Sequence, residues 1–159
     1  MYDLTLEKPA ALADAVKAAS GGAKPLAGGQ TLLASMKLRL SQPGSLVDLG
    51  GVKELAGIRR DGHALVIGAM TRHIDVAGNA EVQAAIPAIT HLAGHIGDRQ
   101  VRAMGTLGGS VANNDPAACY PSAVLGLGAT VHTTQRKIAA DDFFQGMFTT
   151  ALNEGELIT

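Results

Sequence analysis

One stretch near the N-terminus combines a short apolar strand, a glycine pair and a helix, and it constrains the fold more than any other feature. It spans Pro25–Leu40 and reads PLAGGQTLLASMKLRL. Gly28 and Gly29 lack a Cβ atom, so the backbone can turn sharply there and a ligand can approach closely. Thr31 is placed to cap the helix that follows. The expected buried face of this helix carries Leu32, Leu33, Met36 and Leu40. The pattern predicts a strand–turn–helix unit with free backbone N–H groups at the turn.

A second stretch, Gly105–Asn114, has similar chemistry and reads GTLGGSVANN. Free N–H groups at glycine turns bind phosphate, so two such turns could hold two sides of one pyrophosphate. Ordinary structural turns are the alternative, because the chain has 20 glycines and glycine pairs are common in turns. A Rossmann or P-loop fold is disfavoured, since neither GxGxxG after the first strand nor GxxxxGK[ST] occurs.

Composition and charge exclude several classes of protein. Hydrophobic residues make up 47% of the chain and charged residues 17%, which predicts a folded core. The net charge of −1 without a basic block argues against nucleic acid as a partner. No apolar run is long enough for stable membrane insertion, and the start lacks a signal-peptide pattern, so we expect a cytoplasmic protein. The single cysteine, Cys119, excludes an internal disulfide and a cysteine-rich metal site in this chain.

The first part of the chain predicts a small βαβ unit that ends near Gly50. Three short strands joined by two helices indicate a small parallel sheet. The expected strands are 2–6, 24–27 and 45–49, and the expected helices begin at Pro9 and after Thr31. We therefore expect a small lobe over residues 1–50 that carries the first glycine stretch. A larger lobe over residues 51–159 would carry the second, and together the lobes would form one domain.

The rest of the chain predicts a mixture of hairpins and helices. Asp61-Gly62 indicates a hairpin, Thr71 is expected to cap a short helix, and a further helix begins near Pro87. Residues 97–116 are rich in Gly, Asn and Asp and predict a loop. A buried helix over 121–127, a second hairpin around residues 135 and 136, a helical turn at 141–144 and a strand beginning at residue 155 complete the expected elements.

The residues suggest no complete catalytic constellation and no metal site. His91 and His95 have a metal-ligand spacing, but the glutamate of HExxH is absent and Gly94 weakens the helix. Cys119 is expected to be a buried, inert thiol, because no histidine partner can be placed beside it. Asp115 is expected to form a local Asx turn or to bind a sugar hydroxyl. If the protein takes part in catalysis, a cofactor supplies the chemistry and the protein orients it.

Three stretches together resemble a known family. PLAGGQTLLASMKLRL, IGDRQVRAMGTLGGSVANNDPAA and DDFFQGMFTTALNEGELIT resemble, in that order, the FAD-binding medium subunit of molybdenum hydroxylases, the xanthine dehydrogenase and carbon monoxide dehydrogenase group. The resemblance covers nearly the whole chain. It implies an α+β fold of the p-cresol methylhydroxylase (PCMH) type, with a small lobe built on a parallel sheet and a larger lobe with mostly antiparallel strands. FAD would lie extended between the lobes.

The resemblance also implies which residues bind FAD. A first glycine segment and a second glycine segment would contact the pyrophosphate from two sides, and two apolar residues would line the cofactor site. The first segment is Leu26, Ala27, Gly28, Gly29, Gln30, Thr31, Leu32 and Leu33; the second is Thr106, Leu107, Gly108, Gly109 and Ser110; the apolar residues are Ile96 and Leu152.

The partners and the reaction follow from the same resemblance. The subunit would sit beside an iron–sulfur small subunit and a molybdopterin large subunit, and it would pass electrons from the iron–sulfur clusters through FAD to an acceptor. Cys119 departs from the family, which usually carries an aspartate there that contacts FAD. The family also continues into a further domain beyond the end of this sequence. The alternatives are a flavin-free docking module of the same assembly and a binder of another ADP-ribose-containing nucleotide.

Overall fold

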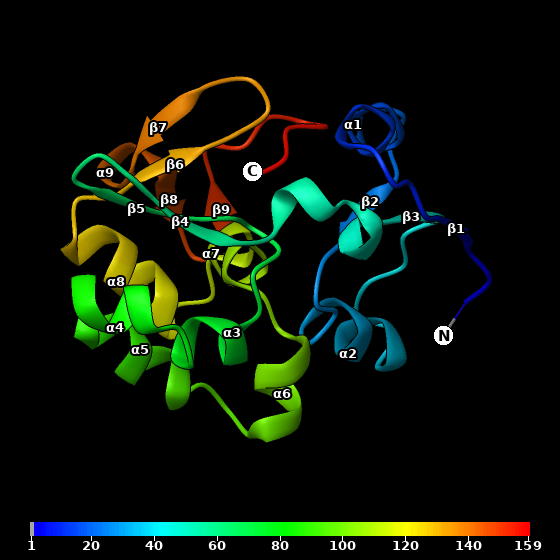
Figure 1. Cartoon of the computed structure of the whole chain (residues 1–159). Helices are drawn as coiled ribbons and strands as arrows, with labels where there is room; N and C mark the ends of the chain where they lie inside the picture. Colours follow the sequence, from blue (N-terminus) through cyan, green and yellow to red (C-terminus); the bar gives the residue numbers. More distant parts are fainter. Residues whose placement is uncertain (1) are drawn as a thin grey trace.

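The computed structural model describes residues 2–159 and begins with a parallel sheet (Figure 1). Its order is β1-β3-β2, so the last of its three strands in sequence lies in the middle. In register, Leu6 lies opposite Leu46, and Pro25 lies opposite Val47. The elements of this N-terminal unit are β1 (Thr5–Glu7), α1 (Leu12–Ser20), β2 (Lys24–Leu26), α2 (Leu32–Lys37) and β3 (Ser45–Asp48). The predicted three-stranded parallel sheet is confirmed.

The rest of the chain forms short helices and three two-stranded antiparallel sheets. Two 3₁₀ helices, Leu49–Gly51 and Lys53–Leu55, lead into it. Its strands are β4 (Ile58–Asp61), β5 (Ala64–Ile67), β6 (Thr130–His132), β7 (Lys137–Ala139), β8 (Phe144–Gly146) and β9 (Thr149–Thr150). Its helices are α3 (His73–Ala77), α4 (Ala80–Ala85), α5 (Pro87–Gly94), α6 (Arg99–Met104), α7 (Leu107–Asn113), α8 (Cys119–Gly126) and α9 (Ala140–Phe143). The predicted α+β fold is confirmed.

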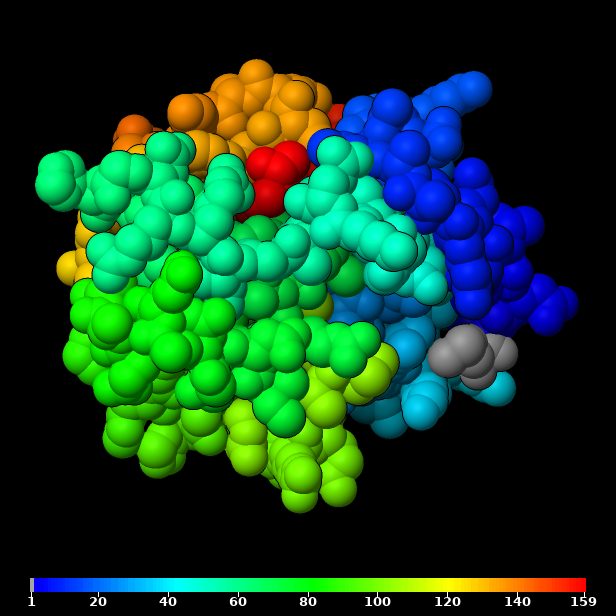
Figure 2. All heavy atoms as spheres, in the orientation of Figure 1, coloured from blue at the N-terminus to red at the C-terminus, as the bar shows by residue number. Residues whose placement is uncertain are grey.

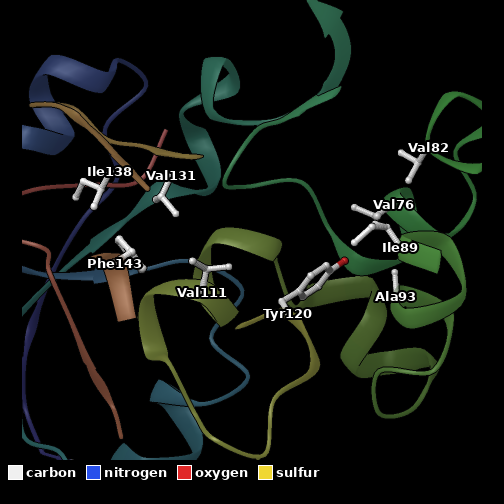
Figure 3. Packing of buried hydrophobic residues seen from close by; sticks show 9 residues of the cluster. All are labelled: Val76, Val82, Ile89, Ala93, Val111, Tyr120, Val131, Ile138 and Phe143. Atoms are coloured by element: carbon white, nitrogen blue, oxygen red, sulfur yellow. The ribbon is translucent and has the colours of Figure 1, made fainter. Parts of the chain in front are cut away.

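Two hydrophobic clusters hold the molecule together, and Figure 2 shows how closely the parts they stabilise pack against each other. The first cluster joins α1, the parallel sheet and the two 3₁₀ helices, and it consists of Ala15, Ala19, Ala23, Val47, Leu49, Val52, Leu55 and Leu157. The second cluster, drawn in Figure 3, consists of Val76, Val82, Ile89, Ala93, Val111, Tyr120, Val131, Ile138 and Phe143. Leu157 lies near the end of the sequence but shares the first cluster with Ala15 and Ala19 of α1 and with Val47 of β3.

The prediction of a loop over residues 97–116 is wrong, because α6 and α7 lie within it. Local capping explains both helices. The Asp98 carboxylate accepts a hydrogen bond from the Val101 N–H at 2.8 Å, and the Thr106 hydroxyl accepts one from the Gly109 N–H at 3.2 Å. The sequence reasoning also missed α4, which Asn79 caps in the same way, and the β8–β9 hairpin.

Three finer expectations about helices are also wrong. The Thr31 side chain makes no capping hydrogen bond at the start of α2. Thr71 does not cap α3, because its hydroxyl bonds to the backbone N–H and C=O of Gly57 instead. Leu40 lies beyond the end of α2 and is 79% exposed, whereas Met36 is buried as expected.

Candidate nucleotide-binding site

The two glycine segments lie in direct contact, although they are far apart in the sequence. A Cβ atom built on Gly28 would lie 2.1 Å from the carbonyl oxygen of Met104 and 2.7 Å from the Cα of Gly105. A Cβ atom built on Gly109 would lie 3.3 Å from that of Ala27. Only glycine permits the first approach, since real side chains do not reach such distances. The turn after β2 therefore packs against the backbone that leads into α7.

The first glycine segment offers a run of backbone donors. Among residues 2–159, no hydrogen bond uses the N–H groups of Gly28, Gly29, Gln30, Thr31 or Leu32 as donors. Gly29 has φ +73°, a backbone conformation that side chains rarely adopt, and its C=O accepts from the Leu33 N–H at 3.0 Å. The residues of the segment are half-buried or exposed. Such a run of free N–H groups fits the oxygens of a diphosphate.

The second glycine segment differs from its prediction, because it is the first turn of α7 and its amides are already engaged. The four engaged N–H groups and their acceptors are Leu107 to the C=O of Thr71 (3.0 Å), Gly108 to the C=O of Ala69 (2.8 Å), Gly109 to the Thr106 hydroxyl (3.2 Å) and Ser110 to the C=O of Thr106 (3.1 Å). The expectation that free amides converge from both segments is therefore wrong for the second one.

The glycines of the second segment instead allow close packing. A Cβ atom on Gly108 would lie 2.5 Å from the Cβ of Ala69, and one on Gly105 would lie 2.6 Å from the Nε2 of His73. The Gly105 C=O also accepts a hydrogen bond from the His73 N–H at 3.0 Å. The sequence reasoning placed Gly105 in the second stretch but did not identify Met104 or His73 as contact residues. Both contacts depend on tertiary packing, so no pattern along the chain pointed to Met104 or His73.

His73 and Tyr120 form a buried polar pair beside this segment. Their ring centroids are 5.3 Å apart, and neither the His73 Nδ1 nor the Tyr120 hydroxyl has a hydrogen-bond partner among the described residues. Burial lowers the pKa of His73 to about 4, because the charged imidazolium would lose its hydration. Burial also raises the pKa of Tyr120, and the neighbouring Cys119 adds to that shift. The imidazole ring of His73 is therefore neutral near pH 7, and in this uncharged form it packs against Gly105.

Ile96 and Leu152 are both half-buried and pack against the second cluster. The backbone at Ile96 is held against α6, because the Arg102 side chain in α6 donates to the C=O groups of Ile96 and Gly97 at 3.3 and 3.0 Å. The same helix ends at Met104, which touches Gly28. Leu152 follows Ala151, whose C=O accepts a hydrogen bond from Arg136.

The remaining candidate residues show local roles. Cys119 is exposed at the start of α8, so the expectation of a buried thiol is wrong. Asp115 forms the expected Asx turn, because its carboxylate accepts from the Ala117 N–H at 2.8 Å. Among residues 2–159, no three His, Cys, Asp or Glu side chains gather as a metal site would require. Two surface hollows of about 500 and about 660 Å³ lie elsewhere, beside α3–α5 and beside α1, and no glycine-segment residue lines them. Within the described part of the chain, no helix is both long and apolar enough to cross a membrane.

Known proteins share both the sequence and this architecture. Residues 2–159 match the family model described as the FAD binding domain in molybdopterin dehydrogenase. The carbon monoxide dehydrogenase medium chain of Afipia carboxidovorans is 42% identical over 159 residues, which covers 96% of this chain and 55% of that protein. The glyceraldehyde dehydrogenase medium chain of Sulfolobus acidocaldarius is 41% identical over 140 residues, which covers 86% of this chain and 50% of that protein.

Solved structures agree with the sequence matches. Reconstituted CO dehydrogenase from Oligotropha carboxidovorans matches with a TM-score of 0.95 at 39% identity, covering 99% of this chain and 58% of that one. Quinoline 2-oxidoreductase from Pseudomonas putida 86 matches with a TM-score of 0.95 at 33% identity, covering 99% and 57%.

The fold, the apposed glycine segments and these matches define a nucleotide-binding domain of a flavoprotein. The chain belongs to the family of FAD binding domains in molybdopterin dehydrogenases, and FAD is the cofactor of that family. It spans about half the length of the curated relatives it matches.

Proposed function

We propose that this chain is the FAD-binding part of the medium subunit of a molybdenum hydroxylase and that it carries electrons from a partner's iron–sulfur clusters to an acceptor. The observation that supports this most is the run of free N–H groups in Gly28–Leu32, held against the backbone of Met104 and Gly105. Relatives named medium chains of dehydrogenases, and one named the FAD-subunit of a nicotinate dehydrogenase, support the same assignment.

The residues of the first glycine segment would hold the pyrophosphate of FAD, namely Leu26, Ala27, Gly28, Gly29, Gln30, Thr31, Leu32 and Leu33. Their unpaired N–H groups would donate to its oxygens and offset its negative charge. The second glycine segment, Thr106–Ser110, would form the opposing wall through its backbone and the Ser110 side chain, because most of its amides are already engaged. Ile96 and Leu152 would supply apolar contacts.

When bound, FAD supplies the redox chemistry, since none of the side chains of this chain can carry electrons between a cluster and an acceptor. The protein's own part is to bind the nucleotide and fix its orientation. We expect an iron–sulfur subunit and a molybdopterin subunit as partners, as the names of the related multi-subunit dehydrogenases suggest.

Two measurements test this proposal. The first is the absorption spectrum of the protein, as purified and after incubation with FAD and desalting. We expect flavin bands that remain with the protein; a folded protein that retains no flavin would contradict the proposal. In the same experiment, ADP-ribose added as a competitor separates FAD recognition from general nucleotide binding. The second is co-expression of this chain with iron–sulfur and molybdopterin subunits. The enzyme's substrate should bleach the flavin bands only when all three subunits are present.

A flavin-free docking module predicts a different result. Such a module would co-purify with the partner subunits while carrying no flavin. The engaged amides of the second glycine segment are the one observation that favours it.

A further inference from the structure

We propose that the C-terminal segment Gly155–Ile158 is a fastener that joins the N-terminal unit to the rest of the molecule and so holds the two glycine segments in contact. The proposal rests on the proposed function in one respect, because FAD is taken to bind where those segments meet. The residues concerned are positioning residues, which act on the site through the packing of the two units.

Gly155 and Leu157 attach the fastener to the N-terminal unit. A Cβ atom on Gly155 would lie 2.5 Å from the Oγ of Ser20 and 2.8 Å from its Cα, at the last residue of α1. Gly155 also has φ +72°. Leu157 is 4% exposed and belongs to the first cluster, together with Ala19 and Val47. Figure 1 shows the red C-terminal segment reaching towards α1.

Ile158, the residue after Leu157, attaches the fastener to the rest of the molecule. Ile158 forms a bridge with Thr133 and packs against the second cluster. The Leu157 C=O accepts from the Thr134 N–H at 2.9 Å, and the Leu157 N–H donates to the Thr134 hydroxyl at 3.2 Å. Successive side chains of an extended chain point to opposite sides, so Leu157 and Ile158 enter different clusters. In Figure 2 the red atoms lie between the orange β6–β7 region and the blue N-terminal unit.

The buried carboxylate of Glu156 fixes the fastener through hydrogen bonds to neighbouring residues. Its side chain is fully shielded from solvent, and its carboxylate accepts from the Thr133 hydroxyl, from Arg136 at 3.1 and 3.2 Å, and from the Asn153 N–H at 2.8 Å. Burial raises the pKa of Glu156, but these hydrogen bonds and the charge of Arg136 lower it by more, so the net shift is downward. A buried carboxylate with so many donors fixes the backbone that carries it.

The glycine contact depends on the same packing. Ala27 and Gly28 belong to the N-terminal unit, whereas Met104, Gly105 and Gly109 belong to the rest of the chain. No hydrogen bond among residues 2–159 joins the two glycine segments to each other. Their contact is therefore maintained by whatever holds the two units together. Loosening the fastener should allow Gly28 to move away from Met104 and weaken FAD binding.

The test compares two core truncations of equal size in the full chain. Leu157→Ala removes a side chain that packs on the N-terminal unit, and Ile89→Ala removes one from the second cluster in α5, where it is 7% exposed. FAD affinity is measured by fluorescence titration at a temperature where both variants are folded. We expect Leu157→Ala to weaken FAD binding at least tenfold and Ile89→Ala to change it less than threefold. Equal FAD affinities in the two variants would overturn the proposal.

A second measurement needs no flavin and separates this proposal from the proposed function. Backbone hydrogen exchange is compared at residues 27–33 and at α5 in the FAD-free proteins. The fastener predicts faster exchange at residues 27–33 in Leu157→Ala than in Ile89→Ala. A uniform increase across the chain would contradict it. If Leu157→Ala fails to fold, Glu156→Gln replaces it in both measurements, with the same expected direction. A parent protein that binds no FAD would overturn the proposed function, and the exchange result would still decide whether the fastener exists.

Discussion

Gly28 and Met104 are in backbone contact: a Cβ atom added to Gly28 would lie only 2.1 Å from the Met104 carbonyl oxygen. This single approach joins the turn after β2 to the end of α6, and thus the first glycine segment to the second. Gly28 does not have a positive φ, so its backbone conformation does not by itself favour glycine. Glycine is required at this position because a side chain would collide with the Met104 backbone.

Gly28→Ala should therefore separate the two glycine segments. Because the obstructing atoms are backbone atoms and cannot rotate away, we expect a loss of about 3 kcal/mol in the free energy of unfolding. FAD affinity should fall by more than tenfold as well. Gly44→Ala is the matched control, since a Cβ atom added there would have no other atom within 4 Å, and it should change stability by less than about 0.5 kcal/mol. Urea unfolding and FAD titration of both variants provide the measurements. A Gly28→Ala variant as stable as the control would refute the packing argument.

Thr106→Ala should destabilise α7. The variant loses the hydroxyl that accepts from the Gly109 N–H, and loss of such a cap costs about 1 kcal/mol. Thr106→Ser keeps the oxygen and should recover most of the stability lost. Thermal unfolding of the three proteins distinguishes these outcomes. If the serine variant is no more stable than the alanine variant, the contribution of Thr106 comes from its buried methyl group and not from capping.

Cys119→Asp should strengthen FAD binding by about tenfold. The resemblance to the family implies an aspartate at this position. Cys119 is also exposed at the first residue of α8, where the helix dipole favours a carboxylate. Cys119→Asn controls for size without the charge. FAD titration of both variants at low salt is the measurement, and unchanged affinity in Cys119→Asp would show that this position lies away from the nucleotide.

Acidification should destabilise the fold through His73. Its folded-state pKa is lowered to about 4 from 6.5, so between these values the unfolded chain binds a proton that the folded chain does not. Stability therefore falls as pH falls from about 6.5 to about 4, by about 2 kcal/mol between pH 7 and pH 5. His73→Phe should remove most of this decline in urea unfolding measured across that range. An equally steep decline in the variant would assign the effect to other groups.

Sequence reasoning succeeded where one local pattern was clear and failed where local signals conflicted or where the contact was tertiary. The strand–turn–helix around Gly28 was predictable because its apolar pattern and its glycine pair are contiguous. Helices α6 and α7 were missed because the Gly, Asn and Asp residues within and around them are typical of a loop. The capping side chains of Asp98 and Thr106 nevertheless start a helix at each place. The contact of Gly28 with Met104 depends on tertiary packing, which no spacing along the chain encodes.

The β8–β9 turn offers a last test, because Phe148 has φ +56° and its side chain is 59% exposed. Asn114, itself at φ +45°, holds this turn: its side-chain amide donates to the C=O of Gly146 at 2.7 Å and of Thr149 at 2.9 Å, and its own C=O accepts from the Phe148 N–H. A left-handed conformation costs a bulky residue about 1–2 kcal/mol.

Phe148→Gly should relieve that strain, and the gain exceeds the greater entropy that glycine has in the unfolded chain. We expect stability to rise by about 0.5–1 kcal/mol, with FAD affinity unchanged. Met147→Gly is the control, because Met147 is 73% exposed without a positive φ and should only lose stability. Differential scanning calorimetry compares the two. A drop in melting temperature for Phe148→Gly similar to that of Met147→Gly would mean that the exposed ring makes a stabilising contact that outweighs its backbone strain.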